Sequence, residues 1–295
     1  MRTLIGTDLA RAVLLLSEGE LVAIPTETVY GLAANAFDPD AVLRIFQVKQ
    51  RPAFDPLIVH VHHRAQVEQL ISQAPPEAEA LIERFWPGPL TLVMQKSSRV
   101  PDIVTSGLDT VGVRMPAHPM TLELLRSLDF PLAAPSANPF GYVSPTTAQH
   151  VADQLGEKIP YILDGGPCAV GVESTIIGWE NGQCVLYRAG GVPVEAIEAV
   201  IGKVGSAQGR VLPVAPGMIE NHYAPRKPLL VGDVPALLLE QAEKRCAVIA
   251  FRSQYDAWRC ETLSPSNDLS EAARNLFTAI RNFDASDADV ILAEV

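Results

Sequence analysis

Apolar residues recur along the first 200 positions with two alternating periods. Residues 9–20 repeat apolar side chains at helical spacing, and they end near a glycine, so they predict a helix that follows a short N-terminal strand. Residues 21–25, LVAIP, form a short apolar run stopped by proline, as is typical of a buried strand. Asp38 and Pro39 open a second helix over residues 38–49 as N-cap and first-turn proline. This alternation indicates an α/β domain.

The same alternation continues to about residue 202. The helix predicted from residue 146 has Ser144 or Thr146 as its expected cap. Strand patterns occupy residues 56–61, 89–94, 110–116, 131–138, 161–166, 173–179 and 184–190, and helix patterns occupy residues 75–85, 146–156 and 193–202.

The pattern changes after residue 202. Residues 203–227 are rich in glycine and proline and have no clear period, so they predict a linker. Residues 228–295 spell strand, helix, strand, helix, strand, which predicts a second domain with a small parallel sheet. Because the chain stops at Val295 inside the last predicted strand, we expect this domain to be incomplete or finished by contact with residues 1–202.

Composition and charge limit the classes of protein to which the chain can belong. The chain is 48% hydrophobic and 19% charged, which favours a folded protein over a disordered one. Its apolar runs stay short of the roughly 20 residues that cross a bilayer, and its four cysteines form no CxxC pair, so we expect a reduced, cytoplasmic protein. The net charge is −11, and residues 1–200 hold 13 Lys/Arg against 22 Asp/Glu, which argues against bulk binding of nucleic acid.

Two cations mark the stretch KQRPAFDPLIVH. Lys49 and Arg51 lie at the end of the helix over residues 38–49, where cations also favour the helix dipole. Pro52 forces the backbone out of the helix, so the Arg51 guanidinium is expected to point into a cleft and fork onto phosphate or carboxylate. In HVHH, His60 and His62 alternate along the predicted strand. A half-buried strand face explains them better than zinc, because no third ligand stands at metal spacing.

Small polar and cationic residues gather where the predicted strands begin or end. Each is ordinary alone, but together they indicate an anion or nucleotide site in an α/β enzyme. The chain has no GxSxG, P-loop or GxGxxG motif, so we expect chemistry by positioning rather than by a protein nucleophile. These candidates are Thr26, Thr28, Tyr30, Ser136, Asn138, Ser144, Ser174, Thr175 and Arg188.

The motifs PTETVYGLAANAF, KxR before PLIVHV, WPGPLT, GLDTVGVRMP, APSAN, DGG before GVESTI, and LYRAG occur in an order that resembles one family. That family is the threonylcarbamoyl-AMP synthases of the long, two-domain Sua type, and the resemblance covers essentially the whole chain. It implies a YrdC-like twisted open α/β sheet over residues 1–202, a linker that contains PGMIENHYAP, and a small Rossmann-like parallel α/β domain over residues 228–295.

The resemblance also implies a reaction. The family condenses L-threonine, bicarbonate or CO2, and ATP with Mg²⁺, and it releases pyrophosphate. Downstream threonylcarbamoyl transferase proteins then pass the group to tRNAs that read ANN codons, so tRNA is an indirect partner and no membrane is involved.

The family's site residues carry over position by position. Lys49 and Arg51 would be catalytic and face the triphosphate, and no metal is expected on the protein itself. Asp55 departs from the family's usual asparagine, since a carboxylate there would repel phosphate unless it holds Mg²⁺ or turns away. The implied L-threonine site is Thr28, His60, Arg114, Ala134 and Ser174, and the implied ATP site is Arg51, Asp55, Thr110, Ser136, Asn138, Ser144, Arg188 and, closing over the nucleotide, Tyr223.

Two other functions use a similar domain. An RNA-binding or ribosome-assembly module is one, and the negative charge of residues 1–200 argues against it. Carbamoyl transfer in hydrogenase maturation is the other, and it would need zinc-finger and transferase domains that the 295 residues do not contain.

Overall fold

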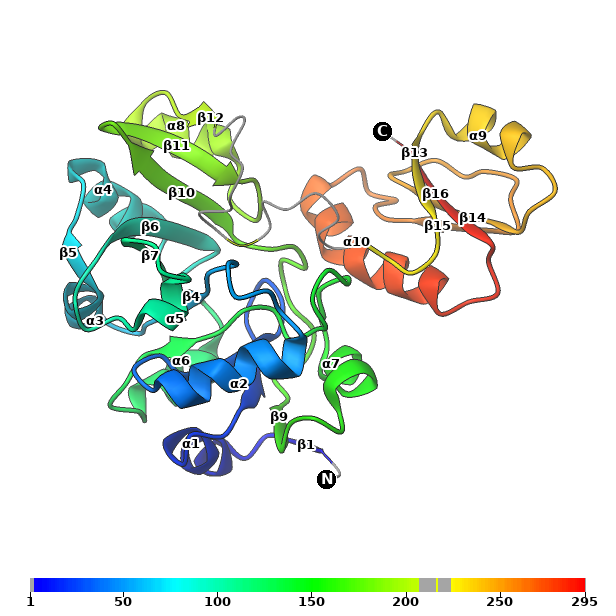
Figure 1. Cartoon of the computed structure of the whole chain (residues 1–295). Coiled ribbons are helices and arrows are strands. Elements are labelled where there is room, and N and C mark those ends of the chain that lie inside the picture. Colours follow the sequence, from blue (N-terminus) through cyan, green and yellow to red (C-terminus); the bar gives the residue numbers. More distant parts are fainter. Residues whose placement is uncertain (1–2, 207–215, 217–223, 295) are drawn as a thin grey trace.

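Figure 1 shows a computed structural model of the chain, which describes residues 3–206, 216 and 224–294. The described residues form two sheets, one in each half of the view, and helix α10 (Leu269–Asp284) lies on the side of the second sheet that faces the first. Most of the predicted linker, and all of Tyr223, lies outside the described residues.

The first sheet is mixed, open and twelve-stranded. Its path runs β1-β9-β2-β3-β8-β4-β7-β6-β10-β11-β12, and β5 pairs with β6 beside that path. Its strands are β1 (Leu4–Gly6), β2 (Val22–Ile24), β3 (Gly31–Asn35), β4 (Ile58–His60), β5 (Ile71–Gln73), β6 (Leu90–Lys96), β7 (Thr110–Arg114), β8 (Leu132–Ala133), β9 (Tyr161–Leu163), β10 (Thr175–Glu180), β11 (Gln183–Arg188) and β12 (Gly205–Ser206).

Helices cover this sheet on both faces. A large apolar cluster joins one face to α2, α4 and α7, and a second cluster joins α1 and α6 to β2 and β9. The helices of this half are α1 (Leu9–Ser17), α2 (Pro39–Lys49), α3 (Arg64–Leu70), α4 (Pro76–Phe85), α5 (Asp102–Thr105), α6 (Pro119–Arg126), α7 (Ala148–Leu155) and α8 (Val194–Ile201).

The pairing of the middle strands brings several strand ends to one edge of the sheet. Strands β4 and β7 are parallel, β6 and β10 run the opposite way, and β11 again runs with β7. Strands β4, β7 and β11 therefore end where β10 begins. The face of β4, β6 and β10 turned away from the large cluster carries Ile58, Val93 and Ile176.

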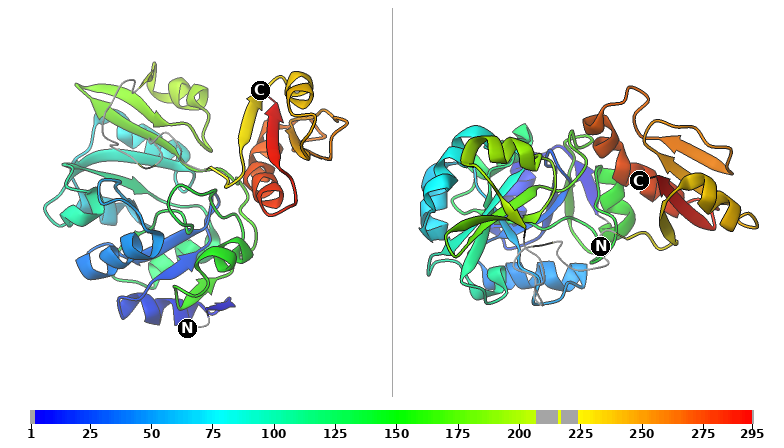
Figure 2. Two further views of the ribbon diagram at one scale, coloured as in Figure 1. Left: turned by 45° about the vertical axis from the view of Figure 1, so that its right-hand side comes forward. Right: turned by 90° about the horizontal axis from the view of Figure 1, so that it is seen from above.

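The second sheet is parallel throughout, with order β13-β16-β14-β15, so the predicted small parallel sheet is confirmed. In the right-hand view of Figure 2, α10 lies between this sheet and the first domain. The short strand β15 was not predicted, because RCET carries only one apolar residue. The remaining elements are β13 (Leu229–Gly232), α9 (Val234–Glu240), β14 (Cys246–Ala250), β15 (Arg259–Thr262) and β16 (Val290–Glu294).

Local signals explain most helix starts. Asp38 caps α2 as predicted, because its side chain accepts hydrogen bonds from the backbone N–H groups of Asp40 and Ala41. The predicted cap of α7 was wrong. Thr147, rather than Ser144 or Thr146, accepts from the N–H of His150 at the start of that helix.

The strand predicted over residues 56–61 is shorter than its apolar run. Strand β4 ends at His60, so His62 does not share a strand face with it, contrary to the prediction. His63 instead caps α3, since its Nδ1 accepts from the N–H of Ala65. The two neighbouring histidines therefore belong to a turn and a helix cap.

Candidate active site

A small cleft opens in the first domain where β4, β7 and β11 end and β10 begins. Arg51, His60, Arg114 and Arg188 reach it from separate elements. The described residues that line it are Thr26, Thr28, Val29, Gly31, Arg51, Ile58, His60, Arg114, Ala134, Pro135, Ser136, Glu173, Ser174, Arg188 and Pro216.

The side chain of Arg114, at the end of β7, is held by three contacts. Its Nη2 lies 2.6 Å from Glu27 Oε1 as an ion pair, and its Nη1 donates to Thr28 Oγ1 at 2.9 Å. Its Nε donates to the carbonyl of Gly88 at 3.2 Å, and β4 is parallel beside it with His60 in register. Because Arg114 is only 3% exposed, these contacts fix the direction of its charge toward the cleft.

His60 is the neighbour of Arg114 across the strand pair and is buried. Burial, with the positive charge of Arg114 adding to it, lowers the pKa of His60 to about 3. The imidazole is therefore neutral at pH 7. Its Nδ1 finds no hydrogen-bond partner among the described residues, so the wall offers one neutral ring nitrogen beside a fixed cation.

Ser174 and Arg188 form a second cationic corner. The Ser174 hydroxyl lies 2.8 Å from Thr91 Oγ1, and Arg188 Nη2 donates to the Ser174 hydroxyl at 3.0 Å. Arg188 also donates to the Ser174 carbonyl and, from Nη1 at 3.1 Å, to the carbonyl of Pro216. Glu173 Oε2 lies 3.8 Å from the same guanidinium. This corner therefore presents an oriented guanidinium, that of Arg188, whose positive charge is partly balanced by the Glu173 carboxylate.

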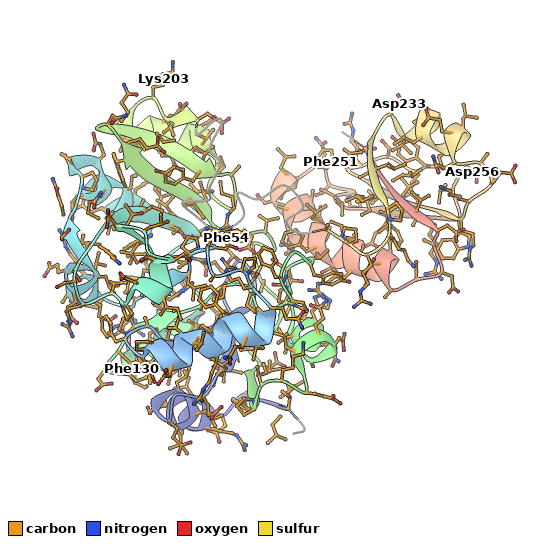
Figure 3. The ribbon with its side chains drawn as sticks, viewed as in Figure 1. Phe54, Phe130, Lys203, Asp233, Phe251 and Asp256 are labelled. Carbon is orange, nitrogen blue, oxygen red and sulfur yellow. The ribbon has the colours of Figure 1, made fainter. Side chains whose placement is uncertain are left out.

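Arg51 holds the loop that leads into β4. Its Nε donates to the carbonyl of Asp55 at 2.9 Å, and its Nη2 donates to the carbonyl of Pro56 at 2.7 Å. Asp55 Oδ2 lies 2.9 Å from Nη2 as an ion pair without an aligned hydrogen bond. Asp55 is fully buried, and it faces Arg51 from behind the wall rather than from within the cleft. On the same loop, Phe54 is 51% exposed (Figure 3).

Burial raises the pKa of the Asp55 carboxyl, and the charges of Arg51 and Lys49 oppose that rise. The carboxylate that replaces the family's asparagine is thus turned toward a cation of the protein.

Lys49 is buried behind the cleft rather than on its wall. Its ammonium donates to the carbonyls of Ser136 and Asn138, each at 2.5 Å. Asn138 in turn donates through Nδ2 to the carbonyl of Tyr142 at 2.6 Å. Burial lowers the pKa of Lys49 well below its usual range, and the charge of Arg51 lowers it further. Lys49 and Asn138 therefore hold the loop over residues 134–146. Of Lys49, Ser136 and Asn138, Ser136 is the one that lines the cleft.

The structure thus brings most of the sequence-predicted residues together, and it separates some from the wall. Ser144 is fully buried, and it reaches the cleft only through its hydroxyl, which donates to Glu173 Oε1 at 2.7 Å. The predicted residues that line the cleft are Thr28, Arg51, His60, Arg114, Ala134, Ser136, Ser174 and Arg188, and those buried behind its wall are Lys49, Asp55, Asn138 and Ser144.

Thr110 lies at the other end of β7 from Arg114. It shares a face of that strand with Gly112 and Arg114, because side chains two residues apart point the same way. It lines a separate depression with Val93 and Trp179. Thr110 therefore lies on a strand that also contributes to the cleft, but it does not line the cleft.

Two acids of the site, Glu27 in PTETVYG and Glu173 in GVESTI, were not predicted from the sequence. Each sits next to hydroxyl residues and pairs with one of the arginines. A carboxylate inside a motif of otherwise anion-binding residues was the available signal, because a buried arginine needs an acidic partner.

Chemically, the cleft binds and orients. The hydroxyls of Thr28 and Ser174 are both bonded to arginines. In the described part of the chain, no group of three or more His, Cys, Asp and Glu side chains converges as a metal site. Within the same residues, none of the helices is both long and apolar enough to cross a membrane.

Family models match nearly the whole chain. The model described as telomere recombination, for the Sua5, YciO and YrdC proteins, matches residues 14–190, and the model for the C-terminal domain of threonylcarbamoyl-AMP synthase matches residues 192–295. The threonylcarbamoyl-AMP synthase of Pyrococcus abyssi is 47% identical, over 94% of this chain and 85% of its own length. That of Bacillus subtilis is 43% identical, over 97% of this chain and 87% of its own length.

A solved structure agrees with these relatives. The crystal structure of Pyrococcus abyssi Sua5 complexed with L-threonine matches 99% of this chain and 92% of its own with a TM-score of 0.93 and 44% identity. Both the expected fold class and the expected enzyme class are thereby confirmed. The chain therefore belongs to the threonylcarbamoyl-AMP synthase family of nucleotidyltransferase-type enzymes.

Proposed function

We propose that this chain condenses L-threonine, bicarbonate or CO2, and ATP to threonylcarbamoyl-AMP and pyrophosphate. The observation that carries the proposal is a single cleft with two fixed guanidinium corners, Arg114 with Thr28 and Arg188 with Ser174. Threonine carries a carboxylate and ATP carries phosphates, and oriented guanidinium groups bind both. The complex of the Pyrococcus abyssi relative with L-threonine supports the choice of amino acid.

The chemistry needs no protein nucleophile. The neutral amine of threonine attacks CO2, loses a proton and becomes a carbamate. A carbamate oxygen then attacks the α-phosphorus of ATP, the bond from that phosphorus to the bridging oxygen breaks, and pyrophosphate leaves. Arg51 and Arg188 stabilise the charge on the phosphates, and Arg114, Thr28 and Ser174 position the threonine.

Mg²⁺ enters this proposal with ATP. This ion is usually held by one or two carboxylates together with substrate phosphates, and Glu173 supplies a carboxylate on the cleft wall. When bound, it would neutralise charge on the leaving pyrophosphate. We place the reaction in the cytoplasm, upstream of transferase proteins that modify tRNAs reading ANN codons.

Pyrophosphate release from ATP without RNA tests the proposal. We expect release that depends on both threonine and bicarbonate, with threonylcarbamoyl-AMP identified by mass spectrometry. A chain that binds RNA tightly and releases no pyrophosphate under any of these conditions would instead be a binding module of the same fold.

A further inference from the structure

Helix α10 of the second domain lies directly behind the cleft. It contacts three segments of the first domain that form the cleft wall: the turn with Val29, the loop over residues 134–146, and the loop that leads to Glu173. No described residue of the second domain lines the cleft. Its contacts with these three segments nevertheless couple it to the geometry of the cleft wall.

The most specific contact is made by Arg281. This side chain is 7% exposed, and its Nε donates to the carbonyl of Ser144 at 3.1 Å. Its Nη2 donates to the carbonyl of Val143 and, at 3.1 Å, to Gln154 Oε1. Two backbone carbonyls of one loop are therefore held by one guanidinium from the other domain.

A short chain of contacts leads from Arg281 into the cleft. The Ser144 hydroxyl donates to Glu173 Oε1 at 2.7 Å, and Glu173 Oε2 lies 3.8 Å from Arg188. Glu173 and Arg188 both line the cleft. A shift of the Ser144 backbone would therefore change where the Glu173 carboxylate and the Arg188 guanidinium sit.

Tyr142 strengthens the same junction. The guanidinium groups of Arg226 and Arg281 both stack on its ring, at 5.4 and 5.2 Å from the ring centre. Its hydroxyl donates to Asp284 Oδ2 at 2.5 Å, and Asp284 Oδ1 accepts from the backbone N–H groups of Arg226 and Lys227. The end of the linker region and α10 are thus joined to the loop over residues 134–146.

The loop to Glu173 packs tightly against α10. Gly171 has a φ of +78°, and a Cβ there would lie 2.4 Å from the Cα of Arg274 on α10. Only glycine allows this approach. Val29, on the cleft wall beside Thr28, belongs to the apolar cluster of Phe277 on the same helix.

We propose that Arg281 is a positioning residue for the nucleotide half of the site, acting through Ser144 and Glu173 on Arg188. The inference rests on the proposed assignment of Arg188 to ATP. It gives the second domain a part in the reaction without any contact to substrate.

The first test compares two cations on α10. Arg281→Met removes the hydrogen bonds to the loop, and Arg274→Met removes an exposed cation whose side chain makes none of these contacts. With magnesium ATP and L-threonine titrated separately by calorimetry, we expect Arg281→Met to weaken ATP binding about tenfold and to leave threonine binding within about twofold. Arg281→Lys, which keeps one donor, should be intermediate, and Arg274→Met should match the wild type.

Steady-state kinetics distinguish a positioning role of Arg281 from a general loss of structure. Arg281→Met should raise KM for ATP more than it lowers kcat, and Arg281→Lys should recover part of the loss. A variant that weakens ATP and threonine equally would show only a structural role and would overturn the inference. So would equal ATP dissociation constants in Arg281→Met and wild type, or a wild-type chain that binds no ATP.

A pair of glycine variants tests the same junction without changing Arg281, in case the Arg281 variants do not fold. Gly171→Ala and Gly107→Ala place alanine at almost the same φ, +78° and +79°, but the new Cβ has open space within 4 Å only at residue 107. We expect Gly171→Ala to weaken ATP binding at least as much as Arg281→Met, and Gly107→Ala to leave it unchanged. Equal ATP affinity in these two variants would also overturn the inference. If the wild type binds both ligands but releases no pyrophosphate, the proposed reaction fails, and the dissociation constants still decide the role of Arg281.

Discussion

At the scale of single residues, each cation of the site is fixed by a partner, and the partners decide what it does. Arg114 and Arg188 are held by acids and still face the cleft. Lys49 has a similar place in the sequence motif, but its ammonium is bonded to two carbonyls of the protein. The sequence could predict that cations gather here. It could not predict which would face ligand, because that depends on carbonyls 87 and 89 residues away.

Replacing Arg51 should have two separable effects. Arg51→Ala removes a charge-assisted contact, typically worth about 1.5–3 kcal/mol, so the Michaelis constant for ATP should rise roughly ten- to hundredfold. It also leaves the buried Asp55 carboxylate without its cation, so the free energy of unfolding should fall.

The double variant Arg51→Ala/Asp55→Asn separates these effects. It removes the buried charge, so stability should recover while ATP binding stays weak. Measurements are denaturant unfolding and pyrophosphate release. Recovery of both in the double variant would mean that Arg51 serves only to balance Asp55.

His60 should make stability depend on pH. Its folded pKa, about 3, lies below the ordinary value of 6.5, so the unfolded chain binds more protons between these values. The free energy of unfolding should therefore fall as pH drops from 7 toward 3. His150, whose pKa burial lowers to about 4, adds a slope of the same sign.

The check is urea unfolding at pH 7, 6 and 5. His60→Gln and His150→Gln should each lose part of the slope. A His60→Gln slope equal to that of the wild type would mean that the pKa of His60 is the same in the folded and the unfolded chain.

At the scale of elements, helices with a clear hydrophobic period and a cap could be predicted from the sequence, and the shapes of the loops could not. The helix over residues 38–49 carries its own cap and proline, and the structure has it at Pro39–Lys49. Strand β3, Gly31–Asn35, was not predicted as a separate strand, because its small buried residues GLAAN alternate no apolar and polar positions. The loop over residues 134–146 could be recognised as polar, but its shape comes from Lys49 and Arg281, which are remote in sequence.

Lys49 offers a prediction about that loop. Lys49→Met keeps the length of the side chain but removes the ammonium from both carbonyls. Among the described residues, the Asn138 carbonyl then has no donor, at a cost of about 1–3 kcal/mol, whereas the Ser136 carbonyl keeps the backbone N–H of Asn138. The free energy of unfolding should fall, and ATP binding should weaken because Ser136 moves.

Lys96→Met is the matched control, since the Lys96 ammonium is bonded to the largely exposed Asp102. Thermal unfolding and ATP calorimetry on both variants are the measurements. A Lys49→Met protein that is as stable as Lys96→Met but binds no ATP would place the Lys49 ammonium on the phosphates rather than on the loop.

At the scale of the whole molecule, the two sheets share an apolar cluster. Val29 and Val143 of the first domain pack with Phe277, Ile280 and the strands of the second sheet. A shared core couples the unfolding of two units, so we expect one calorimetric transition for the wild-type chain.

Val143→Asn tests this coupling, because Val143 is fully buried in the shared cluster and an uncharged amide cannot form an ion pair with Arg281. Burying an amide without partners costs about 1–3 kcal/mol in proteins, and here that cost falls on the junction rather than inside either sheet. The single transition should therefore split in two, with the first-domain transition at the lower temperature. Val231→Asn makes the same change at a position 64% exposed on the second sheet, and it should keep one transition near the wild-type temperature. If Val143→Asn also unfolds in one step, the domains are joined by more than this cluster, and the hydrogen bonds of Arg281 and Asp284 are sufficient to couple them.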